Sequence, residues 1–249
     1  MRIDVVFVGH QMPAADVAGK VVAVVDVLRA STTVAVALSN GARNIIPFDS
    51  TEEVVLRAKS FQRGEVCLAG ERRMLAIPGF DFGNSPREFT QEDVDGKTVL
   101  FSTTNGTAAL VGVQGARDVV VASYVNFSAV LTLLRTALRG GTDVALVCAG
   151  RDRQFSLEDA ACAGRFVREL IAGRDGEVAL NDAARAALHL EAGYGDDLTR
   201  LFADSAHGRA LADAGFAGDL ELCARLDSYP VIPVYQDRQI TKLGPERER

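Results

Sequence analysis

The sequence lacks the patterns that mark several protein classes. Its four cysteines include no C-x-x-C pair, so neither a zinc ribbon nor a disulfide framework is indicated. No apolar run is long enough to span a bilayer, and Met1–Val8 lacks the apolar core and the cleavage pattern of a signal peptide. We therefore expect a cytoplasmic protein with no membrane partner.

An excess of positive charge is also missing. The formal net charge is -6 and no basic stripe offsets it, which argues against a nucleic-acid partner. The chain is 48% hydrophobic and 24% charged, which is ordinary for a soluble globular enzyme. No polar linker divides the 249 residues, so we expect a single domain that spans positions 1–249.

Short apolar runs alternate with helix-like spacing along most of the chain. The runs that we expect to form strands lie at residues 3–8, 21–26, 44–48, 65–69, 97–101, 118–122 and 143–148. From Asn181 onward the spacing is mostly helical, up to a final extended segment at Val231–Tyr235. This alternation predicts a three-layer α/β/α architecture with a mainly parallel or mixed sheet.

The stretch Val21–Thr33, VVAVVDVLRASTT, has the pattern of a buried strand, a polar turn and the start of a helix. That order places Asp26, Arg29 and Ser31 together at the carboxyl edge of a sheet, where open α/β sheets bind their ligands. A helix N-terminus with free amide donors, an arginine fork and the hydroxyls of Ser31 and Thr32 suits an oxyanion, phosphate above all.

The expected strand at 97–101 leads into a turn with the sequence Ser-Thr-Thr-Asn-Gly-Thr, and a helix follows. The turn contains no lysine and does not fit the P-loop pattern, so binding of a nucleoside triphosphate is not indicated. Four hydroxyl groups, with a glycine that permits close backbone approach, would cradle an anion, whereas helix capping would need only one of them. The predicted anion contacts are Thr103, Thr104, Asn105, Gly106 and Thr107.

Two further segments supply candidate substrate contacts. Ile77–Thr90 is rich in turn-forming residues, and loops of this length inside compact domains are commonly functional. Asn84 and Ser85 are its candidate polar contacts, although turn formation alone also explains them. Ser123 follows the expected strand at 118–122 and precedes a helix, so it is another candidate contact.

Acidic residues follow the last buried strand and its turn. The segment at residues 156–159, SLED, fits an acidic variant of the capping box, and carboxylates in the first turn of a helix favour its dipole. One acid would suffice for that purpose. Two adjacent acids at a sheet edge that also holds Asp26 predict instead a Mg²⁺ site with Asp26, Glu158 and Asp159 as ligands.

These groups together indicate Mg²⁺-assisted hydrolysis of a small phosphate monoester. Asp26 and Arg29 are the predicted catalytic residues, because the metal and the arginine would neutralise charge on the transferred phosphoryl group. The expected partner is therefore a small phosphorylated acid, and the sequence is also compatible with a homo-oligomer.

Four motifs in this order, DVLRASTT, GNSPREFT, STTNGT and CAG followed by FSLED, resemble the 2-phosphosulfolactate phosphatase family. The resemblance covers almost the whole chain. It implies an Mg²⁺-dependent phosphatase of coenzyme M biosynthesis that converts 2-phosphosulfolactate to sulfolactate and phosphate, and it adds Gly150 to the substrate site. Ser31 stands where the family commonly has threonine, and the turn at residues 151–154 is more charged than the family pattern. The extra arginines favour a polyanionic substrate.

The same residues also admit other classes of protein. A haloacid-dehalogenase-type mechanism is not indicated, because Leu28 holds the place of its second aspartate. An isochorismatase-like cysteine hydrolase would use Asp26 and Cys148, and Lys59 or Lys97 would have to supply its lysine. A non-catalytic protein that binds small anions is a further interpretation. Metal-dependent turnover separates these functions.

Overall fold

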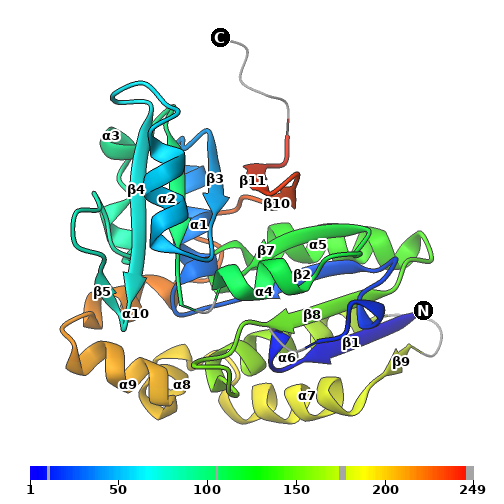
Figure 1. Cartoon of the computed structure of the whole chain (residues 1–249). Coiled ribbons are helices and arrows are strands. Elements are labelled where there is room, and N and C mark those ends of the chain that lie inside the picture. Colours follow the sequence, from blue (N-terminus) through cyan, green and yellow to red (C-terminus); the bar gives the residue numbers. More distant parts are fainter. Residues whose placement is uncertain (10–11, 105, 174–177, 245–249) are drawn as a thin grey trace.

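The computed structural model describes residues 1–9, 12–104, 106–173 and 178–244. Within them the strands form one sheet of eleven strands, in the order β5-β4-β6-β3-β11-β10-β7-β2-β8-β1-β9 (Figure 1). The strands are β1 (Arg2–Val6), β2 (Val21–Val25), β3 (Asn44–Pro47), β4 (Val66–Arg72), β5 (Leu75–Ala76), β6 (Thr98–Ser102), β7 (Asp118–Ala122), β8 (Val144–Cys148), β9 (Ala179–Leu180), β10 (Pro233–Gln236) and β11 (Gln239–Lys242).

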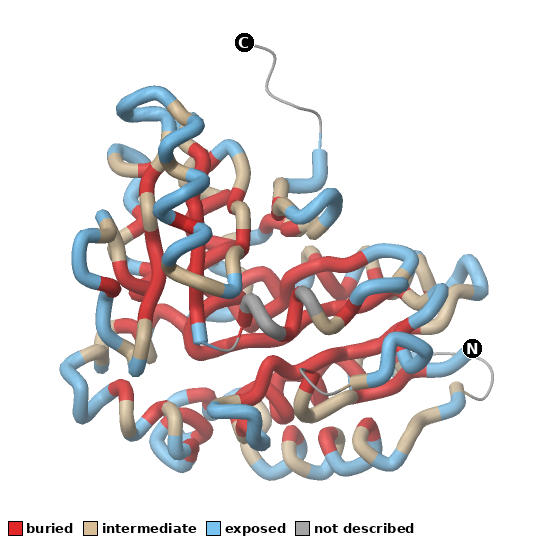
Figure 2. The backbone as a smooth tube through the Cα atoms, viewed as in Figure 1, coloured by how far each residue is buried: buried red, intermediate tan, exposed pale blue. Residues whose placement is uncertain are grey.

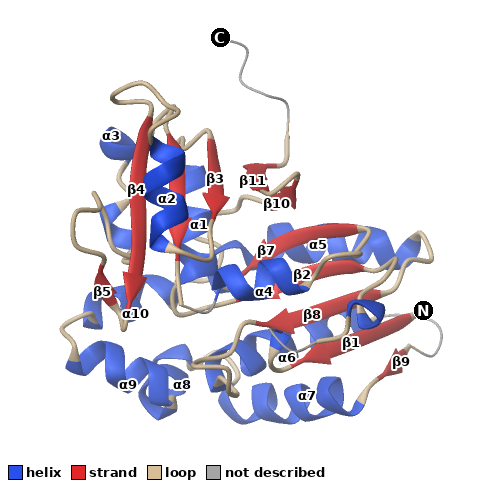
Figure 3. Cartoon of the chain, viewed as in Figure 1, coloured by secondary structure: helices blue, strands red, loops and turns tan. Residues whose placement is uncertain are grey.

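The α-helices flank this sheet on both faces, which confirms the predicted α/β architecture (Figure 3). They are α1 (Ala30–Ser39), α2 (Thr51–Ala58), α3 (Gln91–Val94), α4 (Gly106–Gly112), α5 (Phe127–Arg139), α6 (Leu157–Ile171), α7 (Asp182–Tyr194), α8 (Leu198–Asp204), α9 (Ala206–Asp213) and α10 (Ala217–Cys223). The helical spacing from Asn181 onward is confirmed by α7 to α10, and the Asn181 side chain caps α7 by accepting a hydrogen bond from Ala184 N.

The centre of the sheet is parallel. Strand β2 pairs in parallel with β7 and β8, and β6 pairs in parallel with β3 and β4. Every residue of β2, β6 and β8 is buried, as expected for strands that helices cover on both faces (Figure 2). Along β2 the side chains alternate between two core clusters, because successive residues of a strand point to opposite faces.

A C-terminal hairpin lies inside the sheet and is antiparallel to its neighbours. Strand β10 pairs with β7, strand β11 pairs with β3, and the two pair with each other. The sequence predicted an extended segment here but not its place in the sheet. The strands that the hairpin joins are more than a hundred residues earlier in the chain, and no local pattern encodes such a pairing.

The carboxyl ends of four parallel strands meet at one edge of the sheet and position the site. Asp26 follows β2, Thr103 follows β6, the turn at 149–154 follows β8, and β4 ends at Arg72. Helix α9 supplies a further residue there, His207. Among the described residues, no helix has both the length and the apolar character needed to cross a membrane.

Candidate active site

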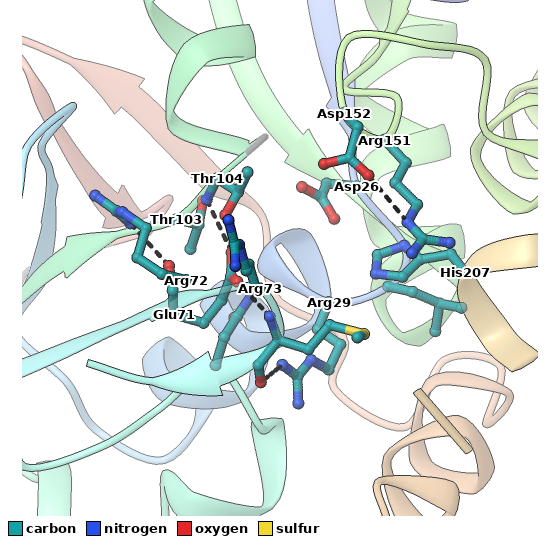
Figure 4. Close-up of a pocket in the computed structure, with 13 residues that line it drawn as sticks. Asp26, Arg29, Glu71, Arg72, Arg73, Thr103, Thr104, Arg151, Asp152 and His207 are labelled. Carbon is teal, nitrogen blue, oxygen red and sulfur yellow. Dashed lines mark hydrogen bonds and ion pairs between the residues drawn. The ribbon is translucent and has the colours of Figure 1, made fainter. Parts of the chain in front are cut away.

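A cavity of about 430 Å³ opens at this edge of the sheet (Figure 4). Five residues predicted from the sequence line it, namely Asp26, Arg29, Asn84, Thr103 and Thr104. The other lining residues are Leu28, Glu71, Arg72, Arg73, Met74, Arg151, Asp152 and His207. The cavity therefore combines carboxylates with several cationic side chains, which suits a phosphorylated acid.

Asp26 is a buried carboxylate in this cavity. It follows the last residue of β2, and its Oδ1 accepts a hydrogen bond of 3.2 Å from Ala30 N at the start of α1. The pKa of Asp26 is raised to about 6, mainly by burial; Glu71 and Glu158 contribute to this rise, while His207 and the Ala30 N–H oppose it. The site thus holds a carboxylate whose negative charge is poorly compensated.

The sequence predicted that Gly106 lets the backbone approach a bound anion; in the structure Gly106 lies close to the carboxylate of Asp26. A Cβ at Gly106 would lie 2.9 Å from Asp26 Oδ2 and 2.7 Å from Ala30 Cβ. A side chain at this first position of α4 would therefore collide with the carboxylate.

Arg29 has a different environment from the phosphate fork that the sequence predicted. Its Nη1 lies 2.8 Å from Asp219 Oδ2, and its Nη2 donates a 2.9 Å hydrogen bond to the carbonyl oxygen of Met74. The guanidinium also stacks on Phe216 at 4.4 Å, and only 2% of the side chain is exposed. These contacts join Arg29 to three segments of the cavity wall, and its role as a phosphate clamp stays a prediction.

Several predicted hydroxyl contacts bond to the protein itself and do not line the cavity. Ser31 Oγ accepts a hydrogen bond from Asp26 N at 2.9 Å, and Thr32 Oγ1 donates to Val27 O at 2.9 Å. Ser85 Oγ donates to Asp219 Oδ1 at 2.6 Å. Ser123 is fully buried and does not line the cavity either; its backbone N–H donates a 2.8 Å hydrogen bond to Asn126 Oδ1. The hydroxyls of Ser31, Thr32 and Ser85 thus have partners within the protein, as buried hydroxyls require, and they stabilise the turns.

The loop and turn residues that do line the cavity are Asn84, Thr103 and Thr104. Asn84 is 5% exposed, and its side-chain oxygen has no hydrogen-bond partner among the described residues. An unpaired buried amide is unfavourable unless a bound group pairs with it, so Asn84 stays a candidate substrate contact. Asn105 and the side chain of Thr107 lie outside the part of the chain that the structure describes.

Asp159, a predicted metal ligand, binds two backbone amides. Its Oδ1 accepts from Val27 N at 2.9 Å, and its Oδ2 accepts from Gly150 N at 3.2 Å. Burial raises the pKa of Asp159 well above its usual range, and the charges of Glu158 and Asp26 add to this shift. Asp159 does not line the cavity. It fixes the two turns that carry Val27 and Gly150, so the predicted Gly150 contact is a backbone anchor.

Glu158, the other predicted ligand, is paired with His207. Its Oε1 lies 3.2 Å from His207 Nδ1, and the Glu158 side chain is 1% exposed. Burial alone would raise the pKa of Glu158, but the hydrogen bond and charge of His207 outweigh it, so this pKa is lowered. Within the described residues, no group of three or more His, Cys, Asp or Glu side chains could hold a metal ion. The three predicted ligands are therefore not brought together around one point.

Comparisons with known proteins connect this geometry to a family. The family model for 2-phosphosulpholactate phosphatase matches residues 7–238. The chain belongs to the 2-phosphosulfolactate phosphatase family. A probable 2-phosphosulfolactate phosphatase from Symbiobacterium thermophilum is 42% identical over 93% of this chain and 97% of its own length. Relatives with the same name from Carboxydothermus hydrogenoformans and Caldanaerobacter subterraneus subsp. tengcongensis are 40% and 37% identical, over 94% and 88% of this chain and 92% and 88% of their own lengths.

Other lining residues of this family member were not predicted as site residues. Arg72 and Arg73 are adjacent basic residues in the sequence, and Arg151 belongs to the charged turn at residues 151–154. Glu71 and His207 stand in no motif that the sequence analysis singled out. His207 reaches the cavity because α9 packs near the start of α6, which local spacing does not reveal.

The cysteine-hydrolase interpretation finds no support in this structure. Cys148 is completely buried in β8 and does not line the cavity. Burial raises the pKa of its thiol well above the usual range, and Asp159 adds to the shift. A nucleophilic cysteine needs the opposite, a lowered pKa and access to the substrate. Neither Lys59 nor Lys97 lines the cavity.

Proposed function

We propose that this protein hydrolyses 2-phosphosulfolactate to sulfolactate and phosphate, with Mg²⁺ as its cofactor. The observation that carries the proposal is the buried carboxylate of Asp26 in a cavity that arginines surround, in a chain whose family match covers 7–238. In the reaction, an oxygen of water forms a bond to phosphorus and the bond between phosphorus and the ester oxygen breaks. The departing oxygen takes up a proton, and water loses one.

The residues of the cavity fit a magnesium ion. Mg²⁺ commonly binds to one or two protein carboxylates and completes its shell with water and phosphate oxygens, so a cage of three acids is not needed. Burial and two neighbouring carboxylates, Glu71 and Glu158, disfavour the charge on Asp26, and a divalent cation would offset that cost. Of the three predicted ligands we retain Asp26, because Asp159 and Glu158 have other partners. When bound, the ion would supply positive charge to the phosphoryl group.

The chain's own residues would bind and orient the ester. His207 and Arg151 lie on one side of the cavity, in the direction of Asp26, where the Arg151 guanidinium would face the phosphoryl oxygens (Figure 4). The unpaired side-chain oxygen of Asn84 is a hydrogen-bond acceptor, so it would pair with a donor such as a bound water and not with the ester's anionic oxygens. Leu28 and Met74 supply apolar surface to the same cavity and restrict the room for water.

The test is a phosphate-release assay on 2-phosphosulfolactate with added Mg²⁺, with excess chelator, and with the variant Asp26→Asn. We expect release with Mg²⁺, none with chelator, and a loss of at least about 100-fold in Asp26→Asn. Asp118→Asn is the matched control, since that side chain is 58% exposed and far from the cavity. Tight binding of the ester without any release would favour the non-catalytic anion-binding interpretation, and release that persists in chelator would refute the metal assignment.

A further inference from the structure

Two tight turns with arginines border the cavity from different strands. The first arginine turn, residues 71–75, joins β4 to β5, and the second, residues 150–154, follows β8. Each contains two consecutive non-glycine residues in the left-handed region: Arg73 and Met74 have φ of 54° and 72°, and Asp152 and Arg153 have φ of 50° and 61°. Such residues seldom adopt this conformation without other constraints, so each turn has a defined shape.

A buried carboxylate anchors each arginine turn at its base. Glu71 Oε2 accepts from Met74 N at 2.9 Å, and its Oε1 accepts from Thr104 N at 2.8 Å. Asp159 does the same for the second turn, through Gly150 N and Val27 N. In both cases one carboxylate ties the turn to a neighbouring segment of the sheet edge. The backbone that carries the side chains of these turns is therefore positioned before any ligand binds.

The two turns each present an arginine whose charge is available to a ligand. Arg73 lines the cavity, and none of the described residues forms a hydrogen bond or ion pair with its side chain, whereas the neighbouring Arg72 bonds to Ser102. Arg151 also lines the cavity, and its ion pair at 3.5 Å is with Asp152, whose side chain is 71% exposed. Exposed pairs of this kind contribute little, so the Arg151 guanidinium can exchange its partner for a substrate anion.

The two arginines lie at opposite ends of the cavity. Figure 4 shows Arg73 on the side of Thr103 and Thr104, and Arg151 on the side of His207 and Asp26. A small substrate that reaches both ends must carry two separate anionic groups. Guanidinium groups suit this task, because their planar forks bind carboxylate, sulfonate and phosphate oxygens through paired hydrogen bonds.

We propose that Arg73 binds one of the two acidic groups that the substrate carries besides its phosphoryl group, while Arg151 contacts the phosphoryl group beside Asp26. This inference rests on the proposed function, and it makes Arg73 the specificity-determining residue. The acidic group is a carboxylate or a sulfonate, which present the same chemistry to an arginine. The side chain of Arg73 would then hold the substrate in one orientation without touching the reacting atoms.

Substrate truncation tests the proposal. We would measure kcat/KM for 2-phosphosulfolactate, for 2-phospholactate without the sulfonate, for 2-phosphooxyethanesulfonate without the carboxylate, and for ethyl phosphate without either group. Arg73→Gln should lower kcat/KM about 10- to 100-fold for substrates that carry the recognised acid and less than about threefold for ethyl phosphate. Whichever truncated substrate loses its sensitivity to Arg73→Gln lacks the group that Arg73 binds. Arg151→Gln should lower kcat/KM for all four.

Arg153→Gln is the matched control, because Arg153 belongs to the second turn but does not line the cavity. Its kinetics should equal those of the wild type, and melting curves should show all three variants folded. An equal loss on ethyl phosphate and on the acidic substrates in Arg73→Gln would overturn the proposal, as would no loss on any of them.

Binding by calorimetry separates this inference from the proposed function. Arg73→Gln should weaken sulfolactate binding at least about tenfold and change inorganic phosphate binding by less than about threefold, and Arg151→Gln should show the reverse pattern. If the wild type hydrolyses none of the esters, the proposed function fails, and these two ligands still decide the role of Arg73. If Arg73→Gln weakens the binding of sulfolactate and of inorganic phosphate equally, the proposal that the two ends of the cavity bind different groups is refuted.

Discussion

Removal of the carboxylate of Asp219 should destabilise this protein more than removal of the charge from any exposed side chain. Asp219 accepts from Arg29 Nη1 at 2.8 Å and from Ser85 Oγ at 2.6 Å, and both ionic side chains are only 2% exposed. In Asp219→Ala the guanidinium keeps its buried charge without a counter-ion, and Ser85 loses its acceptor. Breaking one partner of a buried pair costs about 3–5 kcal/mol.

The expected size of this effect can be measured directly. For a chain of this length, about 1 kcal/mol corresponds to roughly 2–4 °C in Tm, so Asp219→Ala should melt about 6–20 °C lower than the wild type. Urea unfolding supplies the free energy. Asp118→Asn, which breaks an exposed pair with Arg117 at 3.6 Å, is the control and should shift the free energy by about 0.5 kcal/mol or less.

A double variant tests whether the unpaired charge of Arg29 causes the expected loss of stability. If the cost comes from an unpaired buried charge, Arg29→Met combined with Asp219→Leu should lose much less than the sum of the two single changes. A loss below about 1 kcal/mol in Asp219→Ala would show that water reaches the Arg29 guanidinium, and the reasoning would be wrong. Additive losses in the double variant would refute it as well.

Two further predictions concern groups at the end of neighbouring strands. Because the pKa of Asp26 is raised to about 6, the folded state binds its proton more tightly than the unfolded chain; its contribution to stability is therefore present at low pH and is lost as pH rises through about 6. Asp26→Asn should accordingly raise the Tm of the metal-free protein at pH 8 and leave it nearly unchanged at pH 4. A lower Tm at pH 8 would contradict this. Cys148→Ala should keep most of the phosphatase activity at a cost of about 1 kcal/mol in the free energy of unfolding, and abolished activity with an intact fold would restore the cysteine-hydrolase interpretation.

Local patterns predicted the elements of the sheet and the edge that holds the cavity. The β-branched run at Val21–Val25 and the small polar residues after it correctly placed a buried strand before a helix, with Asp26 between them. The capping serine at Ser156 was also correct, since its Oγ accepts from Asp159 N. These features depend on residues within a few positions of each other, where spacing and propensity decide the structure.

The side-chain partners within the site could not be predicted in this way. Arg29 has partners 45 and 190 positions away, at Met74 and Asp219. Ser31 and Thr32 were predicted as anion contacts from their place at a helix N-terminus, but their buried hydroxyls bond to nearby backbone groups. Asp159 is a second example. Its place in the first turn of α6 could be predicted from the sequence, but its bonds to Val27 and Gly150 form only because β2 and β8 end next to each other in the sheet.

The hairpin of β10 and β11 has a consequence for how the chain folds during synthesis. Until residues 233–242 have left the ribosome, β7 lacks its partner β10 and β3 lacks its partner β11. Each of the two strands therefore exposes one unpaired backbone edge. Pairings across such long sequence distances form slowly, and open edges invite association between nascent chains. The two parallel parts of the sheet can therefore join into one cooperative structure only after residues 233–242 have been translated.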